Sequence, residues 1–454
     1  MKINRLKITG LYGYINKDIT FNQDLTLLVG INGSGKTSIL NIISWILKPS
    51  IPYLCMTEFK IIQLYFQYKE TKYEIECKHN RATFKYTISN DKEKFNPLIV
   101  RTTKNHVRDI RNDENLRLSL MQHYSSLKPD QKEQKTWELI STFPHPTVIG
   151  LDRNLFPEES ERLYFEESVK GRLLKKSNQN IITPIDKVKD IINTEYRKKK
   201  DNLLRLTSNL KNYLMLSTFE ASISIESLTQ GIRYRLNLNQ IEKAENRVNE
   251  YFNSFEQKDF SQNEQTIISK YFAQLKIITK QYQDNPNDER VRLLYGLNAN
   301  QFAKVNRLLK EFEKFETDSS KEFENINTYL DTLNFFFKDS AKKLIFKEDT
   351  AELSFHALDK NGKIVSQYKD IKFLSSGEQQ ILILFSYIAF NSQDGRIFII
   401  DEPELSLHIK WQEEFLNQLE RITPSATQLI LATHSPILAN KRKDKARILF
   451  PYNI

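Results

Sequence analysis

The sequence predicts an α/β protein in which a mixed sheet and an antiparallel meander are interrupted by a large helical insertion. Three observations favour this fold class. A glycine-rich turn joins an apolar strand to a helix near residue 30, alternating apolar residues follow between residues 60 and 88, and helical spacing dominates from about residue 154 to residue 338. Strand-like patterns then return. We expect an N-terminal part of the core at 1–153, a helical bundle or short coiled-coil lobe at 154–338 and a C-terminal part of the core at 339–454.

Composition limits the class of protein. The chain has 454 residues, of which 39% are hydrophobic and 27% are charged, as is typical of a soluble globular protein. It contains no run of 18 apolar residues and no apolar leader, so we expect a cytoplasmic protein that does not interact with a membrane. Two cysteines are too few for a disulfide framework or a zinc site. The net charge of +10 allows non-specific DNA binding, but a lysine-rich surface that only keeps the protein soluble is an equally good explanation.

The first expected elements surround the glycine-rich turn. Short strands are expected at Ile3–Thr9 and Ile19–Phe21, followed by a fully apolar strand at Leu25–Val29. The next residues, Gly30–Thr37, match the P-loop pattern, and helical spacing from Ser38 to Leu47 places the motif at the required strand-to-helix turn. The glycines allow backbone N–H groups to face phosphate oxygens. The residues predicted to bind ATP are Asn32, Gly33, Ser34, Gly35, Lys36, Thr37 and Ser38.

The rest of the N-terminal core part is predicted as strands. Alternating residues at Lys60–Tyr68, Lys72–Lys78 and Ala82–Ile88 predict the antiparallel meander. Residues 91–135 carry only weak signals. A buried strand is expected at Thr147–Leu151, ending in Asp152-Arg153.

The insertion is expected to hold four long helices, each spanning ~25–55 Å. They are Ile185–Leu214, Asn239–Phe255, Glu264–Tyr282 and Asn300–Phe337. Their heptads are irregular, so we expect a short antiparallel bundle rather than a long rod. The core then resumes with strands at Leu344–Lys347, Glu352–Ala357 and Lys363–Lys369.

Three further motifs follow. Ser375 occupies the N-cap position of an apolar helix at Ile381–Phe390. An apolar strand ends in the adjacent carboxylates Asp401 and Glu402; Asp401 would bind Mg²⁺ together with Thr37, and Glu402 would polarise the water that attacks the γ-phosphate. A last buried strand, Gln428–Ala432, leads into Thr433-His434-Ser435-Pro436.

Together, the P-loop and these motifs resemble those of the ABC-class ATPases, in the same order, over roughly residues 1–90 and 340–440. The resemblance implies an ABC-type P-loop core that uses ATP and Mg²⁺, and a head-to-tail homodimer or higher homo-oligomer. It also implies that the signature residues Ser375, Ser376, Gly377 and Glu378 contact the ATP bound to the opposite subunit, and that His434 contacts the γ-phosphate as a catalytic residue. The sequence departs from the family in having no clear counterpart of the glutamine that usually follows the meander.

Within this class, the large insertion argues against a transporter subunit, and its irregular heptads argue against a coiled-coil chromosome-maintenance protein. The string Asp401–His408 and the sequence Thr433–Pro436 resemble those of OLD-type ATPases. In OLD nucleases a Toprim domain follows the ATPase, but here only 18 residues follow Pro436, so we expect no nuclease domain in this chain. The chain therefore resembles the stand-alone ATPases of anti-phage defence, such as those of the Septu, retron-associated and PARIS systems, which act with a separately encoded nuclease or toxin effector. A DNA-repair ATPase of the RecF or chromosome-maintenance kind is the alternative.

Overall fold

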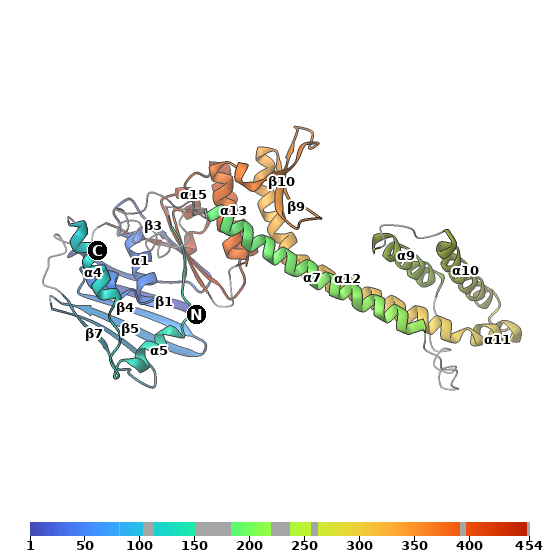
Figure 1. Cartoon of the computed structure of the whole chain (residues 1–454), viewed down its shortest axis with the longest axis horizontal. Helices are drawn as coiled ribbons and strands as arrows, with labels where there is room; N and C mark the ends of the chain where they lie inside the picture. The colour runs from blue at the N-terminus through green and yellow to red at the C-terminus, as the bar shows by residue number, and fades with distance from the viewer. Residues whose placement is uncertain are drawn as a thin grey trace, which may run out of the picture. The chain divides into compact units, whose positions relative to one another are not determined.

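The computed structural model describes residues 1–80, 82–102, 113–150, 183–218, 237–255, 262–390 and 396–451 (Figure 1). The chain divides into two compact units. The first comprises Met1–Glu195 and Thr328–Ile454, and the second comprises Tyr196–Asn327. Helices α7 (Pro184–Thr218) and α12 (Ala299–Phe337) contribute residues to both units. The predicted strand end at Leu151 and the Asp152-Arg153 pair lie outside the described residues.

The first unit contains a five-stranded parallel sheet with the order β14-β3-β13-β12-β8. Its strands are Ala446–Ile448 (β14), Leu25–Val29 (β3), Gln428–Thr433 (β13), Ile397–Asp401 (β12) and Thr147–Ile149 (β8). Strands β12 and β13 are buried along their whole length, which explains why they are predominantly apolar runs rather than alternating patterns. The strands predicted at β3, β12 and β13 are confirmed. Strand β14 was not predicted.

A six-stranded antiparallel sheet has the order β2-β1-β4-β5-β6-β7. Its strands are Lys2–Leu11 (β1), Ile15–Thr20 (β2), Ile61–Tyr68 (β4), Thr71–His79 (β5), Thr83–Asn90 (β6) and Leu98–Arg101 (β7). The predicted meander is confirmed as β4–β6. The segment with weak signals contains β7 together with α4 (Glu114–Ser125) and α5 (Gln134–Ser141).

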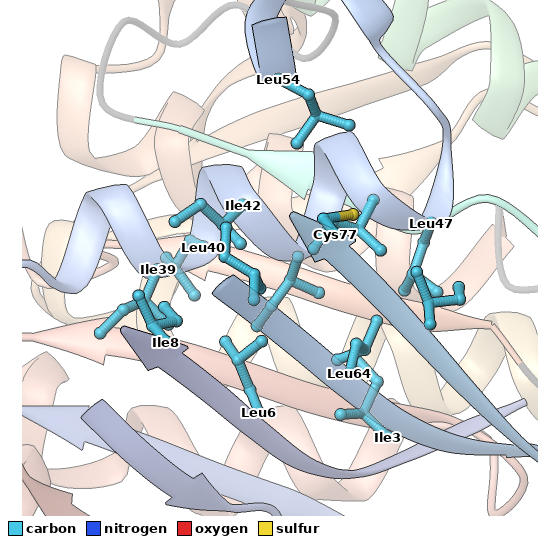
Figure 2. Close-up of a cluster of buried hydrophobic side chains, with 14 of the residues drawn as sticks. Ile3, Leu6, Ile8, Ile39, Leu40, Ile42, Leu47, Leu54, Leu64 and Cys77 are labelled. Carbon is cyan, nitrogen blue, oxygen red and sulfur yellow. The ribbon is translucent and has the colours of Figure 1, made fainter. Parts of the chain in front are cut away.

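Helix α1 (Lys36–Leu47) begins within the P-loop sequence and packs against the antiparallel sheet (Figure 2). Its buried residues Ile39, Leu40 and Ile43 belong to one core cluster with Leu6 of β1 and Leu64 of β4. Each of these side chains is at most 1% exposed. Burial of a side chain of this size stabilises the fold by about 1.5–3 kcal/mol, so the position of α1 is strongly determined. The short helix α2 (Ile51–Met56) follows α1.

The remainder of the first unit carries the C-terminal motifs. A three-stranded antiparallel sheet, β11-β10-β9, precedes them. The elements are Lys342–Phe346 (β9), Leu353–Leu358 (β10), Ile364–Asp370 (β11), Ser376–Phe390 (α13), Ile409–Ile422 (α14) and Pro436–Lys441 (α15). The three predicted strands and the predicted apolar helix are confirmed.

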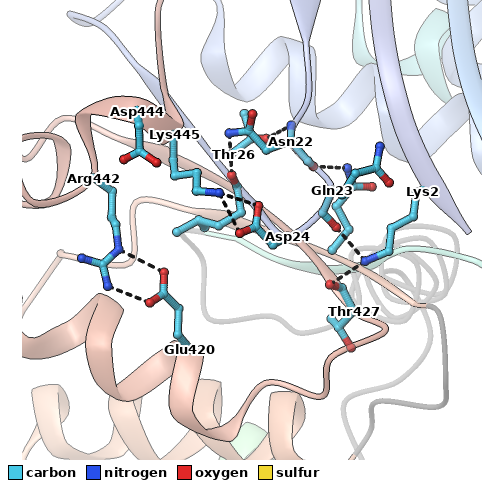
Figure 3. Close-up of polar contacts among 12 residues, drawn as sticks. Lys2, Asn22, Gln23, Asp24, Thr26, Glu420, Thr427, Arg442, Asp444 and Lys445 are labelled. Carbon is cyan, nitrogen blue, oxygen red and sulfur yellow. Dashed lines mark hydrogen bonds and ion pairs between the residues drawn. The ribbon is translucent and has the colours of Figure 1, made fainter.

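Polar contacts attach the N-terminal strands to residues near the other end of the sequence (Figure 3). The Lys2 ammonium donates to the backbone oxygens of Gln23 (2.6 Å) and Thr427 (2.9 Å). Lys445 pairs with Asp24 at 2.7 Å. These contacts hold the starts of β1, β3 and β13 together and attach the segment before β14 to the start of β3.

The second unit is helical. It contains α9 (Leu238–Phe255), α10 (Gln262–Asp284), α11 (Glu289–Leu297) and the parts of α7 and α12 within Tyr196–Asn327. Ion pairs join α12 to its neighbours, from Glu322 to Lys199 of α7 (3.0 Å) and from Glu316 to Arg247 of α9 (2.8 Å). All four predicted helices are present. Helix α12 has 39 residues, about 58 Å at 1.5 Å per residue, which exceeds the expected length, and α11 was not predicted.

Candidate nucleotide-binding site

The site forms where three neighbouring strands of the parallel sheet end. The P-loop follows β3, Asp401 and Glu402 lie at the end of β12, and His434 follows β13. Strand β13 lies between β3 and β12 in the sheet. Because parallel strands present their carboxyl ends at one edge, the fold brings together residues that are about 400 positions apart.

The P-loop backbone has the conformation that phosphate binding requires. Gly33 (φ 80°) and Gly35 (φ 91°) have left-handed conformations that side chains disfavour. Gly35 is the N-cap of α1, no side chain caps this helix, and its first turn contains no acidic residue. The first N–H groups of α1 are therefore available to an anion. A Cβ at Gly30 would lie 2.6 Å from the Leu449 carbonyl oxygen, so only glycine fits beside this backbone.

Lys36 is 4% exposed and points across the P-loop. Its ammonium donates to the carbonyl oxygens of Gly30 (2.8 Å) and Ile31 (3.2 Å) and lies 3.3 Å from Nδ1 of His434. Burial lowers the pKa of Lys36, although Glu402 and the neighbouring carboxylates act to raise it. A bound phosphate would place negative charge beside Lys36 and favour the ammonium form that burial disfavours.

His434 connects Lys36 to Glu402. Its Nε2 lies 3.0 Å from Oε1 of Glu402, while its Nδ1 faces the Lys36 ammonium. An ammonium can only donate, so Nδ1 must accept and Nε2 must carry the hydrogen that is donated to Glu402. The side chains of the P-loop lysine, the predicted catalytic glutamate and the predicted switch histidine are thus in direct contact.

Asp401 and Thr37 fit a magnesium site. Asp401 is 8% exposed, its Oδ1 has no hydrogen-bond partner, and the Thr37 hydroxyl is bonded to its carboxylate. Burial raises the pKa of Asp401, and Glu402 raises it further, while the bond from Thr37 lowers it. Mg²⁺ commonly takes one or two protein oxygens and completes its octahedron with phosphates and water. An unpartnered carboxylate oxygen beside a hydroxyl and a P-loop matches this requirement.

The loop after β12 has an unusual backbone. Glu402 (φ 48°) and Ser406 (φ 67°) both have left-handed conformations, which cost a non-glycine residue about 1–2 kcal/mol each. The Glu402 amide donates to the Ala432 oxygen at 2.9 Å, so the loop remains attached to β13. This conformation directs the Glu402 carboxylate toward His434.

The signature residues lie at the start of α13. Ser375 and Ser376 are exposed, whereas Gly377 is buried against the loop after β12, where a Cβ would lie 2.5 Å from the Ser406 oxygen. Glu378 is 1% exposed. Its carboxylate pairs with Lys342 (2.7 Å) and accepts from the Ser375 amide (2.7 Å), as the glutamate of a capping box does. The structure therefore places Ser375 and Ser376 at the surface and Glu378 in the interior of the same subunit.

Three residues that the sequence did not single out contribute to the site. Glu404 binds the segment that carries His434, Lys342 pairs with Glu378, and Leu449 of the β14 segment packs against the P-loop. Glu404 lies within the Asp401–His408 string, so its position is visible in the sequence. Its bonding partners are not, because they depend on the pairing of β12 with β13.

The fold and the site define a protein with a P-loop ATPase core. A family model described as "AAA ATPase domain" (AAA_15) matches residues 1–439, and the chain belongs to this family. One relative is the "Retron Vc95 probable ATPase" of Vibrio cholerae serotype O1 biovar El Tor, which is 28% identical over 147 residues. The match covers 30% of this chain and 27% of the relative, so the chain spans about a quarter of that protein's length.

Solved structures with similar chains include Smc head domains. One is the head domain with an extended coiled coil bound to the C-terminal domain of ScpA, from Pyrococcus furiosus; it is 14% identical, the match covers 97% of this chain and 91% of that chain, and the TM-score is 0.33. Another is the head domain from Thermotoga maritima, which is 12% identical; the match covers 97% of this chain and 92% of that chain, and the TM-score is 0.35. No helix among the described residues is long and apolar enough to span a membrane.

Proposed function

We propose that this chain binds and hydrolyses ATP at the site between β3, β12 and β13, as the ATPase subunit of an anti-phage defence complex. The direct contact of Lys36, His434 and Glu402 carries the ATPase proposal, because a phosphate-binding cation and a candidate base meet at a P-loop. The defence proposal is supported by the retron-associated relative and by the OLD-like motifs. In this proposal ATP binding gates a separately encoded nuclease or toxin effector.

Each residue of the site has a role in the proposed reaction. The Lys36 ammonium exchanges its bonds to the Gly30 and Ile31 oxygens for phosphate oxygens. Asp401 and Thr37 hold Mg²⁺, which supplies charge neutralisation at the phosphates. Glu402 orients the attacking water and accepts its proton, and the Nε2–H group of His434 exchanges its bond to Glu402 for one to the γ-phosphate.

The signature motif is proposed to act in a dimer. Ser375 and Ser376 are exposed at the N-terminus of α13, where a hydroxyl and helix N–H groups can face an anion on a second copy. Glu378 supports this motif from inside by bonding the Ser375 amide. The proposed active species is therefore a homodimer with two composite sites, or a higher oligomer built from it.

Two variants test the ATPase proposal. Lys36→Ala should lose nucleotide binding, because the phosphate charge is no longer neutralised in the ground state. Glu402→Gln should bind ATP with normal affinity and hydrolyse it about 10²–10⁴-fold more slowly, because it lacks only the base. Binding is measured by titration with a fluorescent ATP analogue and hydrolysis by phosphate release. Wild-type hydrolysis by Glu402→Gln, or unchanged ATP affinity in Lys36→Ala, would contradict the assignment.

The defence role is tested by coexpression with the product of the neighbouring reading frame. Capture of a nuclease or toxin by the wild-type chain, with altered release in Glu402→Gln, is the expected result. Lys36→Ala serves as the nucleotide-free control. If neither capture nor any effect on the toxicity of that product is seen, the gating proposal is wrong even if the chain is an ATPase.

DNA repair remains the alternative, but the structure weakens its main support. In the basic tract 441–445, Arg442 pairs with Glu420 (2.7 Å) and Lys445 with Asp24 (2.7 Å), so both cations already have carboxylate partners (Figure 3). We expect weak, salt-sensitive DNA binding by the isolated chain. Tight, ATP-dependent binding to duplex DNA in a salt titration would favour repair instead.

A further inference from the structure

The Glu404 carboxylate, in the loop between β12 and α14, binds the end of β13 in an unusual way. Its Oε1 accepts three hydrogen bonds, from the Thr433 hydroxyl (2.7 Å), the His434 amide (2.6 Å) and the Ser435 amide (3.0 Å). Its Oε2 is buried without a hydrogen-bond partner. One oxygen thus holds three consecutive residues, and the middle one is His434.

These bonds occur between two elements, where the Ser435 amide has one further contact, to the Thr433 hydroxyl at 2.9 Å. Strand β13 ends at Thr433 and α15 begins at Pro436, so the amides of His434 and Ser435 belong neither to the sheet nor to the helix. A carboxyl or amide oxygen can accept more than one hydrogen bond, so a single oxygen at this position can serve both amides. The Glu404 carboxylate therefore determines the backbone position from which the His434 ring projects.

The loop that carries Glu404 also carries Glu402. The two residues are separated only by Pro403, whose oxygen accepts from Gln380 of α13 at 3.4 Å. Since Glu404 binds the His434 amide while Glu402 binds the His434 ring, the loop holds this histidine at two points. A shift of the loop would move Glu402 and His434 together.

We propose that Glu404 is a positioning residue for ATP hydrolysis. Its Oε1 holds residues 433–435 so that the His434 ring lies between Lys36 and Glu402. The inference rests on the proposed function, since it assigns a role within the same site. It predicts that the acceptor oxygen of Glu404 is required rather than its charge, because all three bonds end on Oε1.

Two substitutions separate the oxygen from the charge. Glu404→Gln keeps an oxygen at Oε1 and places an amide nitrogen where the unpartnered Oε2 lies, so kcat should stay within about threefold of wild type. Glu404→Ala removes the acceptor, and kcat should fall about 10–100-fold, the order expected when a reacting group is misplaced by up to an ångström. ATP affinity should be unchanged, because the P-loop is intact. An equal loss in both variants would overturn the inference.

A double-mutant cycle tests whether Glu404 acts through His434. If it does, Glu404→Ala/His434→Ala should be no slower than His434→Ala alone. Multiplied losses would show an independent role and overturn the inference. Glu413→Ala, an exposed glutamate on α14, is the matched control and should hydrolyse ATP at the wild-type rate.

A folding defect in Glu404→Ala and a failure of the proposed function can each be distinguished from a failure of the positioning role of Glu404. Rates are given per folded protein, as determined from thermal unfolding. If Glu404→Ala does not fold, Thr433→Val removes one of the three bonds to Glu404, together with the bond that the Thr433 hydroxyl accepts from the Ser435 amide. It should lower kcat by a smaller factor with unchanged ATP affinity, and a wild-type rate in that variant would contradict the inference. If the wild-type chain does not hydrolyse ATP, the proposed function fails. If wild type hydrolyses ATP and Glu404→Ala is equally fast, only the positioning role of Glu404 fails.

Discussion

Asp401 is almost fully buried at the end of β12, and one of its carboxylate oxygens lacks a hydrogen-bond partner. Burial raises its pKa, so the folded chain binds a proton at Asp401 more tightly than the unfolded chain does. Above both pKa values the ionised carboxylate therefore destabilises the fold. This cost is expected at a site whose charge is balanced only when a cation binds.

Replacing Asp401 by asparagine should stabilise the nucleotide-free protein. We expect Asp401→Asn to raise the free energy of unfolding by about 0.5–2 kcal/mol at pH 7. The difference from wild type should shrink as the pH falls and Asp401 becomes protonated. Stabilisation by ATP should lose its dependence on Mg²⁺. Thermal unfolding at several pH values, with and without Mg-ATP, measures all three effects; a less stable variant at pH 7 would refute the account.

Gly377 shows that a residue of the signature motif also has a structural role. A Cβ at this position would lie 2.5 Å from the Ser406 oxygen, which is backbone and cannot rotate away. Gly377→Ala should therefore shift the loop that carries Glu402, destabilise the protein by about 1–3 kcal/mol and slow hydrolysis, while nucleotide binding persists.

Gly296 provides the matched control for this substitution. It lies in helix α11, and a Cβ there would meet nothing within 4 Å. Gly296→Ala should be stabilising by up to about 1 kcal/mol, because alanine favours helix. Equal stability changes in the two variants, measured by urea unfolding, would show that the contact between Gly377 and Ser406 is unimportant.

At the scale of elements, the ion pair between Lys342 of β9 and Glu378 of α13 connects the three-stranded sheet to the signature helix. Burial alone would raise the pKa of Glu378, but bonds from Lys342, Ser340 and the Ser375 amide outweigh it and the pKa is lowered. The pair therefore stabilises the fold above the ordinary glutamate pKa near 4.5, and this contribution is lost as the pH falls through the lower folded value.

Breaking the pair should be costly at neutral pH. Lys342→Met leaves Glu378 buried without its cation and should lower the free energy of unfolding by about 2–4 kcal/mol, somewhat less than for a fully buried pair because Lys342 is partly exposed. Adding Glu378→Gln should recover part of the loss. The deficit of Lys342→Met should diminish below pH 4.5. A pH-independent deficit in chemical unfolding would argue against the ionic origin.

Strands and helices with a strong internal pattern could be predicted from the sequence, and those defined by distant partners could not. Strand β3 and helix α1 have apolar runs and a motif that fix their limits. Strand β14 has only three residues beside a basic tract, and it forms because β3 provides an edge. Similarly, the motif residues of the site were identifiable, whereas the pair of Glu378 with Lys342 and the bonds of Glu404 to residues 433–435 depend on tertiary contacts between separate elements.

At the scale of the whole molecule, the proposed dimer makes a complementation prediction. Ser375→Arg and Lys36→Ala chains should each be inactive alone. After mixing they should recover part of the ATPase activity, because a mixed dimer contains one site with an intact P-loop and an intact signature. Phosphate release after mixing measures the recovery, and differently tagged chains establish that subunits exchange. Exchange without recovery would count against composite sites.

The position of β3 between β13 and β14 also affects how the chain folds during synthesis. Both neighbours of this strand are made late, and Gln428 bonds to Ile3, 425 positions away in the sequence. Until residue 428 leaves the ribosome, the P-loop strand has two unpaired apolar edges, the kind of surface that aggregates or recruits chaperones. Nucleotide binding by this chain should consequently appear only after β13 and β14 have been synthesised, and slow pairing between distant segments should set the folding rate.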